Sequence, residues 1–178
     1  GGGFVPAEET SVAESVQVAI GMGSNLGDRR AQIHAAADRL RAYVQALRLS
    51  SLVETAPVGC EPGAPSFLNA AAVGTTAFAP EELLQHCQRI EGELGRHRDR
   101  QPAATPYHSR TIDLDLLLWD ERMLHTPRLT VPHPRLCQRE FVLRPLAELA
   151  PDWRIPPEGV TVAACLRRLR GGGSGSPA

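Results

Sequence analysis

Residues 111–119, TIDLDLLLW, give the clearest secondary-structure signal in the chain and predict a β-strand. Successive side chains of a strand point to opposite faces, so Asp113 and Asp115 point the same way, roughly 6.6–6.8 Å apart along the chain. The residues expected on the other, buried face are Ile112, Leu114, Leu116 and Leu118. A strand with one apolar face needs neighbouring strands and a covering layer of helices.

Strand and helix patterns alternate through the rest of the chain. Alternating apolar residues predict a strand over 16–20 that ends at a glycine-rich turn, 21–27. Asp28 is the predicted N-cap of a helix whose apolar stripe continues to Leu47. Further predicted elements are strands at 51–56 and 67–76, a helix from Pro80 to Gly95, and helices near 143–149 and 162–169.

The order of these elements, β-α-β-β-α-β, predicts an α+β domain. We expect a two-layer ferredoxin-like sandwich, with a largely antiparallel sheet and helices packed on it. The 178 residues fit one domain, at 16–170. Residues 1–15 and 171–178 are rich in glycine and predict flexible flanks, typical either of fusion linkers or of residues added in cloning.

Charge and cysteine usage exclude several classes of protein. The formal net charge of −1 gives no electrostatic case for binding nucleic acid or an anionic membrane. The cysteines have no metal-ligand spacing, so we expect them to be reduced. The N-terminus lacks the pattern of a secretory signal, and no apolar run approaches the ~20 residues that span a bilayer. We therefore expect a cytoplasmic protein.

Asp113 and Asp115 are candidate metal ligands. Adjacent carboxylates repel each other and need a cation or strong hydrogen-bond donors nearby. Hard oxygen ligands suit Mg²⁺, which shares its coordination with substrate phosphates, and two such ions could clamp a polyphosphate. By itself, however, the D-x-D pattern favours the solvated face of an amphipathic strand, with Arg110 as an ion-pair partner.

The glycines of IGMGSNLGD, residues 20–28, do not form a known nucleotide-binding loop. The third glycine of G-x-G-x-x-G would fall at Leu26, and the chain has no lysine for a P-loop. A tight turn from strand to helix accounts better for these glycines.

Seven motifs in order along the chain resemble those of the 6-hydroxymethyl-7,8-dihydropterin pyrophosphokinase family (2-amino-4-hydroxy-6-hydroxymethyldihydropteridine diphosphokinase). The motifs are IGMGSNLGD at 20–28, ETAPVG at 54–59, FLNAA at 67–71, QRIEGELGRHR at 88–98, SRTIDLDLLLW at 109–119, LTVPHPRL at 129–136 and REFVLRPLAELAP at 139–151.

The resemblance implies an enzyme of folate biosynthesis. Its reaction would transfer diphosphate from ATP to 6-hydroxymethyl-7,8-dihydropterin, giving AMP and the pterin diphosphate. ATP would be the co-substrate, and Asp113 and Asp115 would hold two Mg²⁺ ions. The partners would be the small-molecule pterin and ATP, with the chain fused to, or working beside, other folate-pathway enzymes.

The resemblance also assigns the other site residues. The catalytic arginines would be Arg96 and Arg110, on a polar segment, 96–110, that we expect to be a lid over the site. The residues matching the ATP site are Gln88, Glu91, Arg98, Arg110, Leu116, Arg128, Thr130, His133 and Arg139. Those matching the pterin pocket are Thr55, Val58, Phe67, Asn69 and Phe141.

The chemistry of these residue types agrees with the assignment. Two aromatic faces, Phe67 and Phe141, could sandwich a flat heterocycle. Asn69 offers both a donor and an acceptor to the ring edge. We expect His133 to donate a hydrogen bond to phosphate.

Three departures from the family pattern are present, and those in the lid leave an alternative open. Ala56 stands before Pro57 where the family usually has two prolines, and Tyr107 stands where tryptophan is frequent. The lid, with Pro102 and Pro106 inside it, is also a few residues longer than in the shortest family members. The alternative is a non-catalytic pterin- or nucleotide-binding module of the same fold. An RNA-binding ferredoxin-like module would need exposed aromatic residues and a basic charge balance, and the sequence offers neither.

Overall fold

The computed structural model describes residues 14–25, 27–55, 66–99 and 112–175, and for 96–99 and 172–175 it describes the backbone alone. The strands of the main sheet are β1 (Val16–Ser24), β2 (Gln45–Leu49), β3 (Val53–Thr55), β4 (Phe67–Thr76) and β5 (Asp113–Trp119). The helices are α2 (Arg29–Leu40), α3 (Pro80–Asp99), α4 (Glu140–Leu149) and α5 (Val162–Gly175), with a 3₁₀ turn η1 (Leu136–Gln138). Two small hairpins pair β6 (Leu124–His125) with β7 (Thr130–Val131), and β8 (Arg154–Ile155) with β9 (Val160–Thr161).

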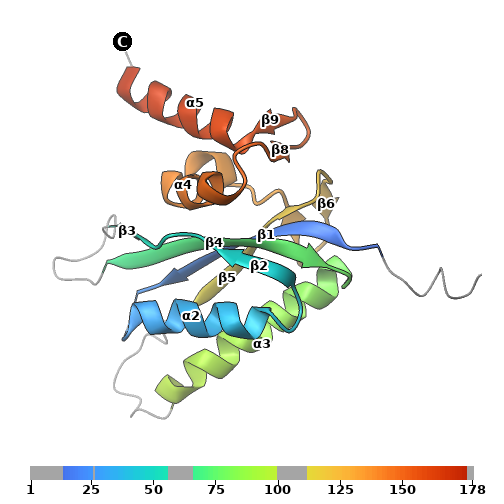
Figure 1. Cartoon of the computed structure of the whole chain (residues 1–178), viewed down its shortest axis with the longest axis vertical. Helices are drawn as coiled ribbons and strands as arrows, with labels where there is room; N and C mark the ends of the chain where they lie inside the picture. Colours follow the sequence, from blue (N-terminus) through green and yellow to red (C-terminus); the bar gives the residue numbers. More distant parts are fainter. Residues whose placement is uncertain (1–13, 26, 56–65, 100–111, 176–178) are drawn as a thin grey trace, which may run out of the picture.

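The main sheet is antiparallel and follows the order β2-β4-β1-β5, with β3 paired to β4 beside β2. Strand β1 is therefore central, and β5, which carries the two aspartates, lies at an edge. Helices α2 and α3 follow β1 and β4 in the chain and pack on one face of the sheet (Figure 1). This arrangement confirms the predicted ferredoxin-like α+β fold.

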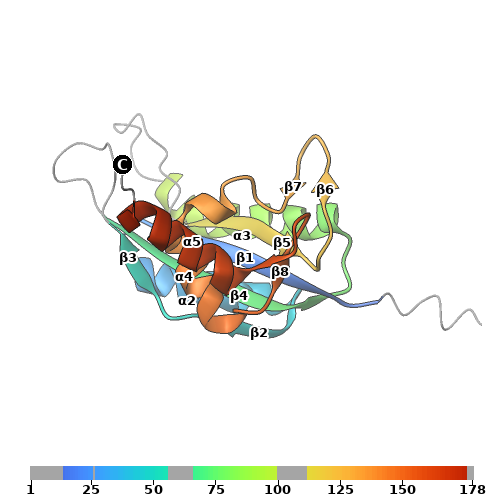
Figure 2. The ribbon, with the colours of Figure 1, turned by 90° about the horizontal axis from the view of Figure 1, so that it is seen from above.

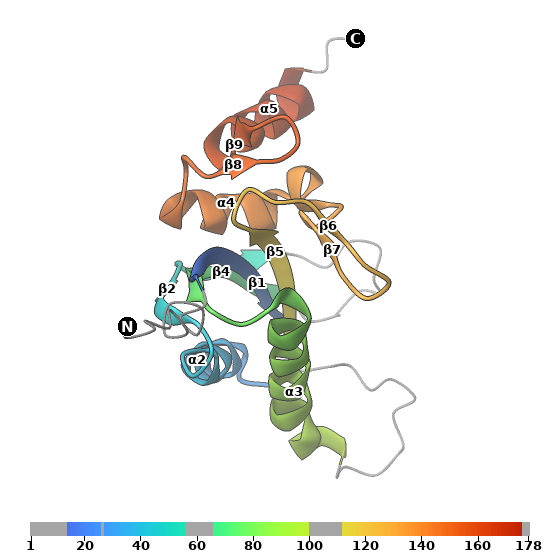
Figure 3. The same cartoon turned by 90° about the vertical axis from the view of Figure 1, so that its right-hand side faces the viewer.

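The opposite face of the sheet is also covered, but only in part. Helix α4 packs across β4, and α5 packs on α4, so that helices lie on both sides of the sheet (Figure 3). Buried side chains accordingly form two clusters. The first core, which includes Ile20, Ile33 and Leu83, fills the α2/α3 side. The second core, which includes Leu143 and Leu146, fills the α4/α5 side. Seen from above, α4 and α5 lie over the sheet beside the hairpin of β6 and β7 (Figure 2).

An irregularity in β5 changes which face its last residues occupy. Ile20 of β1 pairs with Leu116, whereas the preceding residue, Ala19, pairs with Leu118, so β5 has one extra residue at this point. Such a bulge reverses the alternation beyond it. Leu118 therefore packs in the second core with Leu117, and our prediction that it shares a face with Leu114 and Leu116 was wrong.

Three predicted boundaries were also wrong. Strand β1 continues through Gly21 and Gly23 to Ser24, so these two glycines lie in the strand and not in a turn. Helix α2 ends at Leu40, because Val44 and Leu47 belong to the turn and to strand β2, which the sequence had not predicted. Helix α3 continues past Gly95 to Asp99, so residues 96–99, which we expected in a segment without regular structure, are helical.

Other predictions were confirmed. The Asp28 side chain accepts a hydrogen bond from the Ala31 backbone N–H at 3.0 Å, as an N-cap does. Strand β4 and the start of α3 at Pro80 agree with the prediction.

Helix α5 continues through Gly175, into the segment expected to be a flank. None of the helices in the described segments combines the length and apolar character needed to cross a lipid bilayer.

Candidate active site

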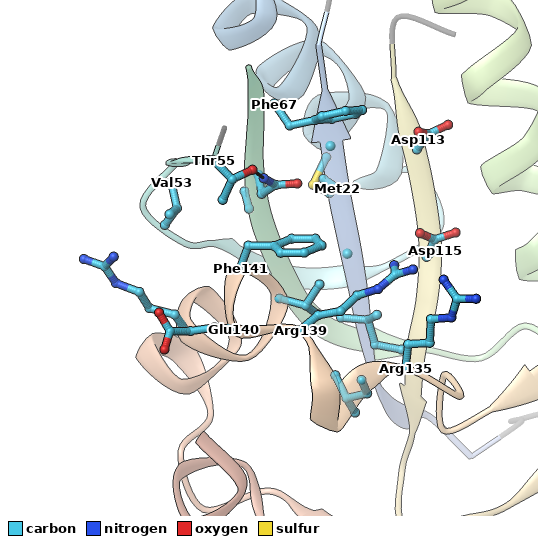
Figure 4. A pocket seen from close by; sticks show the side chains of 18 of the residues that line it. Met22, Val53, Thr55, Phe67, Asp113, Asp115, Arg135, Arg139, Glu140 and Phe141 are labelled. Atoms are coloured by element: carbon cyan, nitrogen blue, oxygen red, sulfur yellow. Dashed lines mark hydrogen bonds between the residues drawn. The ribbon is translucent and has the colours of Figure 1, made fainter. Parts of the chain in front are cut away.

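A cleft of about 850 Å³ opens on the sheet face that α4 leaves uncovered. Its floor is the last part of β1 with the adjoining ends of β3, β4 and β5, and its wall is the segment from His133 to the first turn of α4 (Figure 4). Its volume lies in the range of sites that hold small-molecule ligands. Eight predicted site residues line this cleft: Thr55, Phe67, Asn69, Asp113, Asp115, His133, Arg139 and Phe141.

The acidic side of the cleft is formed by Asp113 and Asp115. In the strand register Asp113 lies opposite Gly23 and Asp115 lies opposite Gly21, so no side chain of β1 stands beside either carboxylate. Asp115 is exposed and Asp113 is half-buried. Both point toward the cleft from β5 (Figure 4). The strand therefore presents two hard oxygen ligands to whatever occupies the cleft.

The aromatic side of the cleft is formed by Phe67 at the start of β4 and Phe141 in the first turn of α4. Their rings lie on either side of a gap beside which Thr55 is found (Figure 4), and Asn69 lines the same cleft. Asn69 is only 8% exposed, and its Nδ2 atom donates to Thr55 Oγ1 at 2.9 Å. This bond fixes the amide, so that the Oδ1 atom is directed away from Thr55. A flat ring with polar edges fits between two such aromatic faces.

The glycine at position 23 leaves the space that Asn69 needs. A Cβ atom added to Gly23 would lie 3.1 Å from Asn69 Oδ1 and 3.9 Å from Phe67 Cδ1. The first distance is closer than ordinary van der Waals contact, so any side chain here would push against the amide. The glycines of residues 20–28 thus shape the cleft floor, which turn chemistry alone would not predict.

The basic side of the cleft is formed by His133, Arg135 and Arg139. The guanidinium groups of Arg135 and Arg139 extend toward Asp115 (Figure 4). The His133 backbone N–H donates to Leu117 O at 3.0 Å, which holds this segment against the bulge in β5. Arg139 also lies over the Phe141 ring, 5.8 Å from its centroid.

His133 is placed to act as a neutral donor. Its Nδ1 atom accepts from the Arg135 backbone N–H at 3.2 Å, which assigns the proton of the neutral ring to Nε2. Burial lowers the pKa of His133, and Arg139 and Arg135 lower it further, against the opposing effect of Asp115. The neutral ring is therefore favoured, and its Nε2–H can bond an anionic oxygen.

Five predicted ATP-site residues lie outside this cleft. Arg128 and Thr130 are exposed around the turn that joins β6 to β7, and Gln88 is exposed on α3. Leu116 is 3% exposed and packs in the first core, so a contact with ATP would have to come from its backbone. Glu91 accepts a hydrogen bond from the Leu114 backbone N–H at 2.7 Å, at the point of β5 between the two aspartates.

Some predicted residues lie outside the described part of the chain, and some cleft residues were not predicted. Val58 and Arg110 are outside the described residues, as are the side chains of Arg96 and Arg98. The cleft residues that the prediction missed include Met22, Val53, Arg135, Glu140 and Arg144. Arg135 carried a usable signal, because it follows His133 by two residues inside the motif LTVPHPRL.

The two aspartates fit a magnesium site of the kind that is completed by a substrate. Among the described residues no group of three or more His, Cys, Asp or Glu side chains could enclose a metal ion. Mg²⁺ is commonly bound by one or two carboxylates, with the remaining positions taken by water and by substrate phosphates. The pair in an open cleft has this donor chemistry, whereas a structural metal site would be closed by protein ligands.

An antiparallel α+β sandwich with paired carboxylates, arginines and two facing aromatic rings in one cleft has the features of an enzyme that binds a polyphosphate beside a flat heterocycle. Residues 19–151 match the family described as 7,8-dihydro-6-hydroxymethylpterin-pyrophosphokinase (HPPK), and the chain belongs to this family.

Individual relatives agree with the family match. The chain is 45% identical over 132 residues to the 2-amino-4-hydroxy-6-hydroxymethyldihydropteridine pyrophosphokinase of Bacillus subtilis, covering 73% of this chain and 75% of that one. It is 42% identical over 142 residues to the enzyme of the same name from Pseudomonas aeruginosa, covering 79% and 84%.

A solved structure supports the fold independently of sequence. The HPPK-DHPS A437G protein of Plasmodium falciparum, crystallised with SDX-DHP, matches with a TM-score of 0.69 at 14% identity. The match covers 91% of this chain and 47% of that one, so this chain spans about half the length of that protein. At this identity the likeness establishes the fold alone.

Proposed function

We propose that this chain transfers diphosphate from ATP to the hydroxymethyl group of 6-hydroxymethyl-7,8-dihydropterin, in a Mg²⁺-dependent reaction of folate biosynthesis. The observation that carries the proposal is one cleft in which Asp113 and Asp115 face the pair Phe67 and Phe141, in a member of the HPPK family. The curated relatives carry this substrate in their names.

The pterin would lie between the rings of Phe67 and Phe141. Its ring edge carries both donors and acceptors, and Asn69, held by Thr55, would present its amide to that edge. Gly23 leaves the amide room to take this position. The hydroxymethyl group would then point along the cleft toward β5, where the aspartates lie.

The triphosphate of ATP would lie between the acidic and basic sides of the cleft. Asp113 and Asp115 would hold the magnesium, for which we propose two ions, and the bound metal would neutralise phosphate charge as it develops during transfer. Arg139, Arg135 and the Nε2–H of His133 would bond the phosphate oxygens from the other side. Lid roles for Arg96 and Arg110 stay a prediction from the family resemblance.

In the reaction the pterin hydroxyl oxygen attacks the β-phosphorus of ATP. The bond between that phosphorus and the oxygen bridging it to the α-phosphorus breaks, so AMP leaves with the bridging oxygen and the hydroxyl proton passes to water. Transfer of this kind depends mainly on positioning and electrostatic stabilisation, so no strong general base is needed.

The test is AMP release from MgATP with and without the pterin, in the wild-type chain and in Asp115→Ala. We expect pterin-dependent AMP from the wild type and a loss of roughly a hundredfold or more in the variant, because the ligand to the metal is removed. Asp152→Ala, an exposed carboxylate outside the cleft, should keep the wild-type rate. EDTA should abolish the wild-type rate, and added Mg²⁺ should restore it.

Two results would contradict the proposal. Near-normal turnover in Asp115→Ala would exclude the metal assignment. A wild-type chain that binds both ligands but releases no AMP would instead be a non-catalytic binding module of the same fold.

A further inference from the structure

Three side chains behind the aromatic side of the cleft form a closed network. Arg29 is the first residue of α2, Glu54 lies in β3, and Ser66 directly precedes β4. The Arg29 Nη2 atom lies 2.8 Å from Glu54 Oε2, and Ser66 Oγ donates to the same oxygen at 2.8 Å. Arg29 Nη1 donates to both Ser66 Oγ and Ser66 O, each at 2.8 Å. Each side chain therefore contacts the other two.

Glu54 borders the cleft as part of β3, but its side chain is directed to the other face of the sheet, toward Arg29 and Ser66, which do not line the cleft. In the ladder of β3 with β4, Glu54 pairs with Leu68 and Thr55 pairs with Phe67. Leu68 packs in the first core, on the α2 side, whereas Thr55 and Phe67 line the cleft. Because strand side chains alternate, Glu54 points toward α2 and its neighbour Thr55 points into the cleft.

The network holds the strand pair on which the proposed pterin subsite is built. Thr55 and Phe67 form the end of the ladder, where only β4 pairs with the three-residue strand β3. A strand end this short is free to separate from its partner. The Arg29 guanidinium joins Glu54 on one strand to Ser66 at the start of the other, and so opposes that separation.

The chemistry of the network suits such a role. A guanidinium binds a carboxylate and a carbonyl in a fixed, planar arrangement, which restrains geometry more than a single flexible contact does. The hydrogen bond from Ser66, followed by the hydrogen bond and charge of Arg29, lowers the pKa of Glu54. The carboxylate is thus the ionised partner that the network needs at neutral pH.

We propose that Arg29, Glu54 and Ser66 are positioning residues for the pterin subsite. They would fix the spacing of Thr55 and Phe67 from the back of the sheet, and with it the Thr55–Asn69 hydrogen bond. Arg29 and Ser66 are not among the residues that line the cleft. This inference rests on the proposed function, because that function supplies the ligand of the subsite. The stability of the β3–β4 pairing, however, can be measured without any ligand.

The chain offers a matched control on the same helix. Arg39 of α2 forms an ion pair with Glu93 of α3, also at 2.8 Å, and neither residue lines the cleft. Arg29→Ala and Arg39→Ala each remove one arginine–glutamate pair from α2. Only Arg29→Ala should disturb the proposed pterin subsite.

The experiment measures dissociation constants for the pterin and for MgATP, and backbone hydrogen exchange of the free protein. We expect Arg29→Ala and Ser66→Ala to weaken pterin binding about three- to tenfold, since exposed pairs and single hydrogen bonds contribute modestly. MgATP binding should stay unchanged, and exchange should become faster at 53–55 and 67–69. Arg39→Ala should match the wild type in all three measurements.

The outcomes separate this inference from the proposed function. Unchanged exchange at 53–55 and 67–69 in Arg29→Ala would overturn the positioning role whatever the ligand. Equal losses for pterin and MgATP, or the same losses in Arg39→Ala, would show a general structural effect and overturn it too. If the wild type binds no pterin, the proposed function fails, and the pterin-positioning role fails with it.

Discussion

Gly23 has no side chain, and this leaves room for the Asn69 amide beside the proposed pterin subsite. Gly23→Ala should weaken pterin binding roughly five- to fiftyfold, because the new methyl group lies 3.1 Å from Asn69 Oδ1 and moves the amide by a few tenths of an ångström. MgATP binding should change little. The check is a pair of titrations, one for each ligand; a variant that loses affinity for both equally would show damage to the sheet and not to the subsite.

Glu54 gives the network behind the cleft a defined pH dependence. Its pKa is lower in the folded chain than in the unfolded one, so its contribution to stability is present above the unfolded pKa and is lost as the pH falls through the folded pKa. Glu54→Gln should therefore lower the melting temperature at neutral pH, and the difference from wild type should shrink on acidification. Glu121→Gln, an exposed residue after β5, serves as control. A difference that stayed constant with pH would contradict this account.

Two glycines show how differently the same substitution acts in different elements. Gly92 lies exposed in α3 with open space at its Cβ position, so Gly92→Ala should raise the unfolding free energy by about 0.5–1 kcal/mol. Gly74 lies in β4, where a Cβ atom would stand 2.6 Å from Val44 Cγ1 and 2.7 Å from the Gln45 carbonyl oxygen. Gly74→Ala should cost about 1–3 kcal/mol. Urea unfolding measures both; changes of the same sign would refute the comparison.

The sequence predicted the elements whose periodicity is strong and missed those where local geometry overrides it. Strand β4 and the start of α3 at Pro80 were both predicted correctly from the sequence. Strand β2 was not, because Val44 and Leu47 continue the helical spacing of α2 and Ala46 adopts a positive φ of 52° that no pattern signals. The bulge in β5 was equally invisible, since it depends on pairing with β1.

The candidate site was predictable where residue type carries the chemistry. Strand alternation predicted that Asp113 and Asp115 share a face, and the resemblance assigned them to the site together with the aromatic and basic residues. Glu91 shows the limit of that inference. Its carboxylate bonds to the Leu114 backbone, a contact that depends on how α3 crosses β5 and not on any spacing within α3.

At the scale of the whole molecule, helix α4 has two roles: its buried residues stabilise the second core, and its first turn forms part of the cleft wall. Its first turn carries Phe141, while Leu146 is fully buried against the sheet. Leu146→Ala should lower the unfolding free energy by about 2–5 kcal/mol, because a cavity would remain between helix and sheet. Leu149→Ala, at a partly buried position, should cost less. Chemical denaturation tests the order of the two effects, and the reverse order would contradict this packing account.

The hydrogen bond between Glu91 and Leu114 occupies a backbone donor at the edge of the sheet. Strand β5 is an edge strand, and an edge strand with unpaired backbone groups invites the strand of another molecule to join the sheet. Glu91 occupies the Leu114 backbone donor midway along the segment that carries the aspartates, and it brings an acidic side chain to the same edge. Among the described residues, the contact thus removes one backbone donor from the outer edge of β5 and places a carboxylate beside the strand that carries the two aspartates.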